Sequence, residues 1–341
     1  MNYRKLTPEG PEISVIGFGM WTVSTPMWGI KDDQIGLSLI NEAFLNGITF
    51  FDTADVYGDG RGETMLREGL GDHRDEIVIA TKFGYDFYNY PGVQPGQRER
   101  PQDWSPAFVR KVCEESLKRL GTDYIDLYQL HNPRLDAINC DDLWAELHAL
   151  RDEGKIRVIG AALGPALKPE RQIDEGITAI RERGAPLQII YNMLEQPLGN
   201  ALFPIAAEQN AGIIVRVPHA SGLLEGNYNE NTRFEPSDHR QHRVPTDEAR
   251  KKWLIEGLKK VESLRFLARD EHRTMGQAAL LYVLLERSII SALPNIYNRE
   301  QLLEFAHAPD APALTLDEIA RVADILSNSD YALTDINQSA R

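Results

Sequence analysis

Cysteine is scarce in this sequence: only Cys113 and Cys140 occur among 341 residues. The two do not have the spacing of a metal site, and each lies in a segment with a helical pattern. We therefore expect reduced thiols rather than metal ligands, as is typical of cytoplasmic proteins. Histidines are also few, and no two of them are four residues apart as in a zinc-binding helix. The sequence thus predicts no metal site.

Positive charge and long apolar runs are lacking as well. Lys and Arg number 37 against 51 Asp and Glu, which gives a net charge of −14 and a pI of about 5.1. A chain this acidic is not expected to bind nucleic acid or an anionic membrane. No apolar run reaches the roughly 18–20 residues that a membrane helix needs, and the first residues lack the apolar core of a signal peptide. We therefore expect a cytoplasmic protein, and the sequence leaves its oligomeric state open, a homo-oligomer included.

What the sequence does contain is a regular alternation of short apolar segments and helical segments. The apolar segments show little polar alternation, which is typical of parallel strands covered on both faces. Eight such units favour a (β/α)8 barrel, the TIM barrel, over an open sheet. The predicted strands are Gly17–Met20, Ile48–Thr53, Ile77–Lys82, Tyr124–Leu130, Arg157–Gly160, Leu187–Asn192, Gly212–Val217 and Ser288–Leu293.

We predict a single barrel domain over residues 1–341, with several additions to the repeated units. Residues 2–17 are predicted to form an N-terminal β-hairpin that turns at Glu9–Pro11. Residues 84–105 and 218–247 are predicted to be active-site loops. Residues 309–341 are predicted to hold an extra C-terminal helix and a polar tail.

Polar residues fall at the ends of the predicted strands. Asp52, Asp55 and Tyr57 follow the second strand in quick succession, Lys82 ends the third and His131 ends the fourth. Each of these has an ordinary structural explanation when taken alone, such as a capped turn, a buried ion pair or a core histidine. Active sites of such barrels lie at the C-terminal ends of the strands, so all of these side chains are expected at one rim.

This set of residue types suits proton transfer to a carbonyl oxygen. A phenol has a pKa of about 10 and is a poor acid or base at neutral pH, but a nearby lysine cation lowers that pKa. An aspartate keeps the lysine charged, and a neutral imidazole can orient the carbonyl by a hydrogen bond. No side chain supplies hydride, so this chemistry requires a nicotinamide cofactor.

The sequence resembles the aldo-keto reductase family. The resemblance is carried from about residue 3 to residue 308 by motifs in the family's order. They are Phe51–Gly58 with Gly62 and Glu63, Ala80–Phe83, Asp123–His131, Gly154–Arg157 with Ile159 and Gly160, Tyr191–Asn192, Gly222–Leu224, and Pro294 with Glu300 and Gln301. It implies the barrel fold and an NAD(P)(H)-dependent oxidoreductase that acts on an aldehyde, a ketone or a sugar.

The resemblance also implies roles for individual residues. Tyr57 would be the general acid/base, Asp52 and Lys82 would tune it, and His131 would orient the carbonyl. The small-molecule substrate would meet Trp21, Tyr57, Tyr85, His131 and Asn132. The cofactor contacts would be Gly19, Met20, Asp52, Gln188, Arg216, Pro218, Ala220, Gly222, Leu224, Asn295, Tyr297, Arg299 and Gln301.

The chain departs from the family pattern where the cofactor would be held. Ala162 and Leu163 stand where the family has Ser-Asn to hold the nicotinamide carboxamide, and Arg216 stands where an aromatic residue is common. Phe305 replaces an Asn that usually meets the adenine. Asn295 and Tyr297 occupy positions that are commonly basic in users of NADP(H), so the family favours NADP(H) but NAD(H) stays open. These departures leave one alternative, a cofactor-sensing regulatory subunit with the same barrel and little turnover.

Overall fold

The computed structural model describes residues 1–25, 29–92, 99–236, 238, 240, 246–269 and 271–327. The predicted loops over 84–105 and 218–247 therefore lie partly outside the described residues, and so does the tail after residue 327. Within the described ranges, strands and helices alternate in the predicted order.

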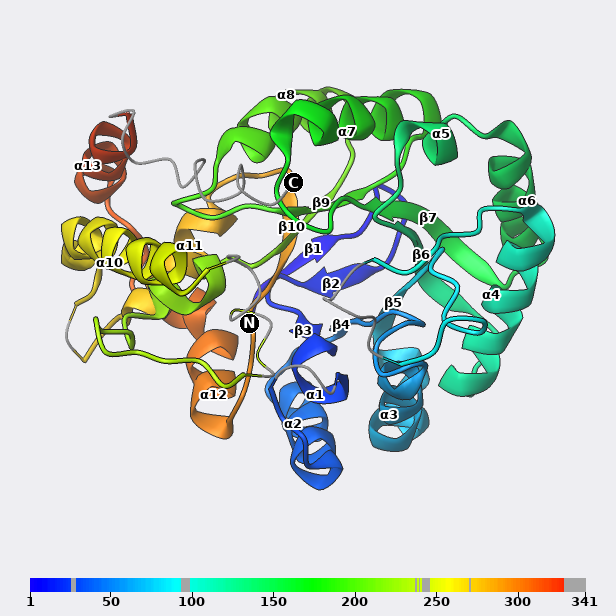
Figure 1. Ribbon diagram of the computed structural model, residues 1–341, viewed down its shortest axis with the longest axis horizontal. Coiled ribbons are helices and arrows are strands. Elements are labelled where there is room, and N and C mark those ends of the chain that lie inside the picture. Colours follow the sequence, from blue (N-terminus) through cyan, green and yellow to red (C-terminus); the bar gives the residue numbers. More distant parts are fainter. Residues whose placement is uncertain are drawn as a thin grey trace.

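Eight parallel strands form a nearly closed barrel at the centre of the molecule (Figure 1). Each strand pairs with its neighbours in chain order from β3 to β10. A parallel bridge between Ile16 and Ala292 joins the first and last members of this sheet. The strands are β3 (Phe18–Gly19), β4 (Phe50–Asp52), β5 (Val78–Phe83), β6 (Ile125–His131), β7 (Ile156–Ala162), β8 (Leu187–Ile190), β9 (Ile213–Arg216) and β10 (Ile289–Leu293). The predicted (β/α)8 barrel is confirmed.

Helices surround this barrel and pack on it through an apolar layer. Three of them begin at a proline, Pro106, Pro169 or Pro197, a position where the missing N–H has no helical partner to lose. The outer helices are α2 (Asp33–Leu45), α3 (Arg61–Leu70), α4 (Pro106–Leu120), α6 (Asp141–Asp152), α7 (Pro169–Arg183), α8 (Pro197–Gln209), α11 (Met275–Leu284) and α12 (Arg299–Ala306).

Among the described residues, four further α-helices lie outside the repeated units. They are α1 (Trp21–Ser24), α5 (Leu135–Ile138), α10 (Asp247–Leu264) and α13 (Leu316–Ser327). The last confirms the predicted extra C-terminal helix, whereas α1 and α5 are single turns that the sequence did not predict. Of the helices in the described ranges, none is both long and apolar enough to cross a membrane.

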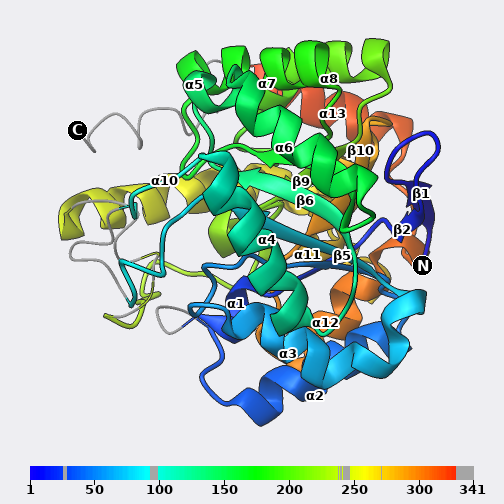
Figure 2. The same ribbon diagram turned by 90° about the vertical axis from the view of Figure 1, so that its right-hand side faces the viewer.

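The predicted N-terminal hairpin closes one end of the barrel. It consists of β1 (Tyr3–Lys5) and β2 (Glu12–Ser14), paired antiparallel. Leu6 and Ile13 are fully buried in one apolar cluster with Phe50, Leu127 and Ile214 of the barrel strands. Figure 2 shows the hairpin at the opposite end of the molecule from α10. The end that is left for a site is therefore the one at the C-terminal ends of the strands.

Along several strands the side chains on one face change from apolar to polar. Residues two apart on a strand share a face, so Phe50 and Asp52 of β4 point to the same side, as do Leu127, Gln129 and His131 of β6. Phe50 and Leu127 belong to the cluster beneath the hairpin, and the polar residues come later in each strand. This order concentrates buried polar groups at the open end of the barrel.

Candidate active site

The residues predicted to be catalytic meet at the open end of the barrel. Asp52, Lys82 and His131 lie at the C-terminal ends of β4, β5 and β6, and Tyr57 follows β4 in the next turn. Lys82 Nζ donates to Asp52 Oδ1 at 2.6 Å and to Tyr57 Oη at 3.3 Å. The ring centroids of Tyr57 and His131 are 5.9 Å apart, with the rings edge to face. The four side chains thus form one continuous group.

Lys82 is buried and keeps its charge. Burial alone would lower the pKa of Lys82, but the attraction of Asp52 and Tyr57 outweighs it and the pKa is raised above its ordinary value. The carbonyl of Thr53 accepts a further hydrogen bond from Nζ at 2.8 Å. The ammonium group is therefore fixed by three acceptors on one side of the site. At this distance it stabilises negative charge on the oxygen of Tyr57.

Asp52 is held by more than its lysine. Its second oxygen, Oδ2, accepts from Gln188 Nε2 at 2.8 Å and from Gln129 Nε2 at 3.1 Å. A buried carboxylate with this many donors is well solvated by the protein. Gln188 was predicted to contact the cofactor. Its side-chain nitrogen donates to Asp52, so its side-chain oxygen is the atom that can accept a hydrogen bond from another group.

Asp55 stands apart from this group, although it belongs to the same turn. It is fully buried, and burial together with the charge of Glu63 raises the pKa of Asp55 well above its ordinary value. Its backbone N–H donates to the carbonyl of Lys82 at 3.1 Å, which ties the turn to β5. We assign Asp55 to the support of the turn.

His131 is a neutral imidazole. Burial, followed by the positive charges of Lys82 and Arg216, lowers the pKa of His131 well below its ordinary value. A neutral ring can donate one hydrogen bond to a carbonyl oxygen without carrying charge itself. Tyr85 packs edge to face on the other side of the ring, with centroids 4.9 Å apart.

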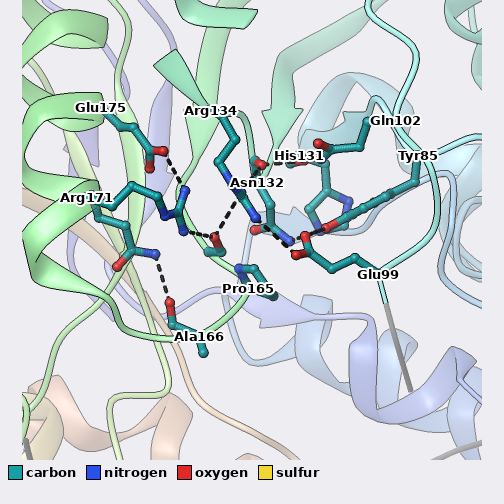
Figure 3. A network of polar contacts seen from close by, with 12 residues as sticks. Tyr85, Glu99, Gln102, His131, Asn132, Arg134, Pro165, Ala166, Arg171 and Glu175 are labelled. Carbon is teal, nitrogen blue, oxygen red and sulfur yellow. Dashed lines mark hydrogen bonds and ion pairs between the residues drawn. The ribbon is translucent and has the colours of Figure 1, made fainter. Parts of the chain in front are cut away.

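The residues predicted to meet the substrate line the same opening. The ring of Trp21 lies edge to face against Tyr57, with centroids 4.9 Å apart. Asn132 directly follows His131, and its side-chain amide donates to Tyr85 Oη at 2.8 Å (Figure 3). The structure therefore places Trp21 against Tyr57, and Tyr85 and Asn132 next to His131.

Arg216 connects two of the departures from the family pattern. Its Nη2 donates to the carbonyl of Leu163 at 2.9 Å and to that of Pro165 at 3.1 Å. The loop after β7, where Ala162 and Leu163 lack polar side chains, is thus held by an arginine that comes from β9. The guanidinium is also close enough to His131 to lower the pKa of that residue.

The predicted cofactor residues after β9 lie in a turn that contains several residues in the left-handed conformation. Val217, Ala220, Ser221 and Gly222 all have positive φ, and the last three begin the short helical segment η3 (Ala220–Glu225). Three backbone N–H groups donate within this turn, Ala220 to Val217 and both Gly222 and Leu224 to His219. Pro218, Ala220, Gly222 and Leu224 are buried in this turn. Gly19 and Met20 lie beside Asp52, where the backbone N–H of Met20 donates to the carbonyl of Asp52 at 2.8 Å.

The predicted residues after β10 lie next to this turn. Gln301 Nε2 donates to Glu225 Oε2 at 3.0 Å, and Gln301 Oε1 accepts from the backbone N–H of Tyr297. Asn295 is half-buried in the same segment. Arg299 forms an ion pair with Glu42 at 2.7 Å instead, and its side chain is 63% exposed. Phe305 packs against the ring of His219, with centroids 4.5 Å apart.

Several residues of the site were not predicted from the sequence. Gln129 could have been found, because it shares a face of its strand with His131. Glu99, Gln102 and Arg134 could not, because their contacts depend on the path of a long loop. In Figure 3 the side chains of Glu99, Gln102 and Arg134 lie around Asn132 and His131.

Comparisons with known proteins agree on one family. Residues 15–327 match the sequence model of the Aldo/keto reductase family. Aldo-keto reductase YhdN of Bacillus subtilis (strain 168) is 32% identical over 269 residues, 77% of this chain and 76% of that protein. The NADH-specific methylglyoxal reductase of Escherichia coli (strain K12) is 29% identical over 326 residues, 92% of this chain and 96% of that protein. Among solved structures, the glycerol dehydrogenase AKR11B4 from Gluconobacter oxydans aligns with a TM-score of 0.79 at 29% identity, over 95% of this chain and 94% of that chain.

Proposed function

This chain belongs to the aldo/keto reductase family and is an oxidoreductase, and we propose that Tyr57 is the general acid/base of its reaction. The observation that carries the proposal is the buried line from Asp52 through Lys82 to Tyr57, with contacts of 2.6 Å and 3.3 Å. Lys82 donates to the phenol oxygen, so the hydroxyl proton of Tyr57 is left to point toward a substrate. In reduction, Tyr57 would give this proton to the carbonyl oxygen, and in oxidation it would take the proton back.

His131 would hold the same carbonyl oxygen from the other side. The ring is neutral, faces Tyr57 at 5.9 Å between centroids, and can donate one hydrogen bond. A positioned donor and acid at one oxygen lower the barrier because they meet negative charge as it develops there. Charge on Lys82 would stabilise the phenolate that remains on Tyr57 after the proton has left.

A nicotinamide dinucleotide would supply the hydride when bound. The residues present fit such a group. A Cβ added at Gly19 would meet no other described atom within 4 Å, so space is open beside Asp52. The carbonyl oxygen of Gln188 would accept from a carboxamide, because only its amide nitrogen bonds Asp52.

The residues and the family resemblance point to different cofactors, so the test compares binding of NADP(H) with binding of NAD(H). The family resemblance favours NADP(H). Arg299 lies in an ion pair with Glu42, and Asn295 and Tyr297 carry no positive charge, which favours NAD(H). The name of the methylglyoxal reductase relative includes NADH.

We infer that the substrate is a small carbonyl compound, a sugar or the matching alcohol. Trp21 and Tyr85 flank Tyr57 and His131 with aromatic rings, which suits a short aldehyde, ketone or sugar ring. Two relatives are named for three-carbon substrates, methylglyoxal and glycerol. Both compounds belong in the first panel, together with aldoses and aromatic aldehydes.

The test is a fluorescence titration of the protein with NADPH and with NADH, followed by a turnover panel with the tighter cofactor. We expect saturable binding of at least one cofactor and measurable reduction of a small aldehyde. Absence of binding by either cofactor would overturn the proposal. Binding without turnover of any compound would favour the regulatory alternative instead.

A further inference from the structure

The ring of His131 is oriented by the side chains packed around it rather than by a hydrogen bond to Nδ1. Nδ1 is buried and has no hydrogen-bond partner among the described residues. A catalytic histidine usually has one ring nitrogen bonded to a fixed group, which sets the tautomer and the rotation of the ring. Here the ring is confined by the edges of Tyr57 and Tyr85, so its direction also depends on the backbone that carries it.

That backbone is held by a side chain from the loop after β5. Gln102 Nε2 donates to the carbonyl of His131 at 2.8 Å and to the carbonyl of Asn132 at 3.3 Å (Figure 3). Carbonyls at the end of a strand have lost their ladder partners, so an outside donor satisfies them. The amide of Gln102 therefore joins the two peptide units that aim the imidazole. We call these two residues, His131 and Asn132, the histidine corner.

The histidine corner has an unusual backbone that needs such support. Asn132 has φ of +55°, a left-handed conformation that costs energy for a residue with a Cβ. Its backbone N–H donates to Ala162 at 2.8 Å, its side chain donates to Tyr85 Oη, and its carbonyl also accepts from Arg134 at 2.6 Å. Strained residues keep their conformation only when several contacts fix them, and here the contacts come from strand β7 and from the loops after β5 and β6.

The part of the loop that carries Gln102 is itself well supported. Tyr85 and Gln102 form an antiparallel bridge, flanked by backbone hydrogen bonds from Asp86 to Pro101 and from Asp103 to Gly84. Gly84 has φ of +126°, and a Cβ there would lie 2.3 Å from the ring of Trp104. Only glycine fits this close approach, which fixes the base of the loop.

Two ion pairs hold the same loop from opposite sides. Glu99 pairs with Arg134 at 3.0 Å, next to the histidine corner, and Arg100 pairs with Asp59 at 2.7 Å, two residues after Tyr57. Successive residues of opposite charge thus connect the loop to the turn that bears Tyr57 and to the corner that bears His131. Glu99 also accepts from the hydroxyl of Tyr85.

We propose that Gln102 is a positioning residue for catalysis, which fixes the histidine corner so that His131 and Tyr57 address one carbonyl oxygen. Tyr85 completes the arrangement through its hydroxyl bond to Asn132. The kinetic consequence rests on the proposed function, whereas the structural consequence for the imidazole does not. Gln102 acts through main-chain carbonyls, so it affects the geometry of the reaction without contacting the substrate.

The test replaces Gln102 by Met, which keeps the length of the side chain and removes both donors. We expect kcat to fall about tenfold or more, because a small misplacement of a catalytic group is costly. The cofactor dissociation constant should stay within about twofold of wild type, since Gln102 lies outside the predicted cofactor contacts. Tyr88→Phe is the control, because Tyr88 is on the same loop and its hydroxyl bonds Arg119 rather than the corner.

The second readout is the titration of His131, followed by NMR of histidine labelled at Cε1 and assigned with His131→Asn. Wild type should show a pKa well below 6.5, and Gln102→Met should move it upward as water reaches the loosened ring. Gln102→Asn, which keeps the amide but shortens its reach, serves if the Met variant does not fold.

Three outcomes would overturn the proposal. They are an unchanged kcat in a folded Gln102 variant, an unchanged His131 titration, and an equal loss of kcat in Tyr88→Phe. If wild type reduces no carbonyl at all, the proposed function fails, and the His131 titration still decides whether Gln102 holds the corner.

Discussion

At the scale of residues, Asp52 has, among the described residues, the largest number of hydrogen bonds to other side chains of the proposed site. Asp52 is only 4% exposed, so protein donors replace water around its carboxylate. One oxygen accepts from Lys82, and the other accepts from Gln129 and Gln188. A charged lysine can be buried this deeply because the carboxylate is already in place. The ammonium group of Lys82 bonds Asp52 and the carbonyl of Thr53, and its third hydrogen bond goes to the hydroxyl oxygen of Tyr57.

The first prediction concerns this buried pair. Lys82→Met should lower the free energy of unfolding by about 3–5 kcal/mol, because it leaves the charge of Asp52 buried without a cation. The double variant Lys82→Met with Asp52→Asn should be less destabilised than Lys82→Met alone, since the stranded charge has been removed. Urea unfolding of the four proteins in this cycle measures both effects. Simple additivity of the two single changes would contradict the interpretation.

The clustering of Asp52, Lys82 and His131 could be predicted because these residues lie at strand ends. A strand fixes its direction and its period, so Asp52, Lys82 and His131 had to emerge at one rim once eight strands were recognised. The side chains of Gln102 and Arg134 follow no such period. Their contacts are decided by the path of loops, and the sequence contains no local signal for that path.

At the scale of elements, the loop after β7 shows how the chain replaces missing side chains. Its successive carbonyls accept from arginines on different elements: Arg216 bonds Leu163 and Pro165, while Arg171 and Arg134 bond Gly164. The departures at Ala162 and Leu163 and at Arg216 therefore belong to one local arrangement. The sequence alone presented them as separate anomalies.

The turn after β9 provides a prediction about pH. Burial raises the pKa of Glu225 to about 8, Arg240 opposes the rise, Glu304 adds to it, and Gln301 opposes it by a hydrogen bond. A raised pKa contributes stability that is present below the unfolded value near 4.5 and is lost as pH rises through about 8. Glu225→Gln should remove this dependence, so wild type should lose up to about 4 kcal/mol relative to the variant between pH 5 and pH 9.

Urea unfolding without cofactor at pH 5 and pH 9 measures the difference. Glu208→Gln is the matched control, because Glu208 is on the surface of α8 with a side chain that is 60% exposed. Parallel pH profiles for wild type and Glu225→Gln would show that Glu225 is not the group that titrates in this window.

At the scale of the whole molecule, the hairpin that closes the barrel and the residues of the proposed active site lie at opposite ends of the barrel. The hairpin lies at one end of the barrel (Figure 2), and Asp52, Lys82 and His131 lie at the C-terminal ends of the strands. Arg4 of the hairpin donates to the carbonyls of Leu284, Glu286 and Ile289, where α11 leads into β10. These bonds hold the hairpin to the last unit of the barrel, close to the bridge that completes the sheet.

Arg4→Met should therefore lower the free energy of unfolding by about 2–3 kcal/mol, because three carbonyls lose a charged donor. It should leave kcat and the cofactor dissociation constant unchanged, since the site is at the far end. Lys5→Met is the control, because Lys5 is exposed and bonds only the nearby carbonyl of Pro8 in the described part of the chain. A fall in kcat at temperatures where Arg4→Met is folded would contradict this separation.

The architecture could be predicted from the sequence because many weak signals agree. Apolar strands, a strict alternation of elements and the count of eight units all favoured the (β/α)8 barrel, and helix α13 appeared where it was expected. The short helices α1 and α5 were missed, since four residues within a loop give no periodic pattern.

Tyr57 is the residue on which the proposed proton transfer depends, so the most direct measurement is a comparison of wild type with Tyr57→Phe. The phenylalanine ring keeps the contacts with Trp21 and His131 and removes only the hydroxyl that Lys82 addresses. Single-turnover reduction of the best carbonyl substrate should slow by at least about 10³-fold, while the cofactor dissociation constant stays within about twofold of wild type. Turnover by Tyr57→Phe at the wild-type rate would contradict the central claim that this hydroxyl transfers the proton.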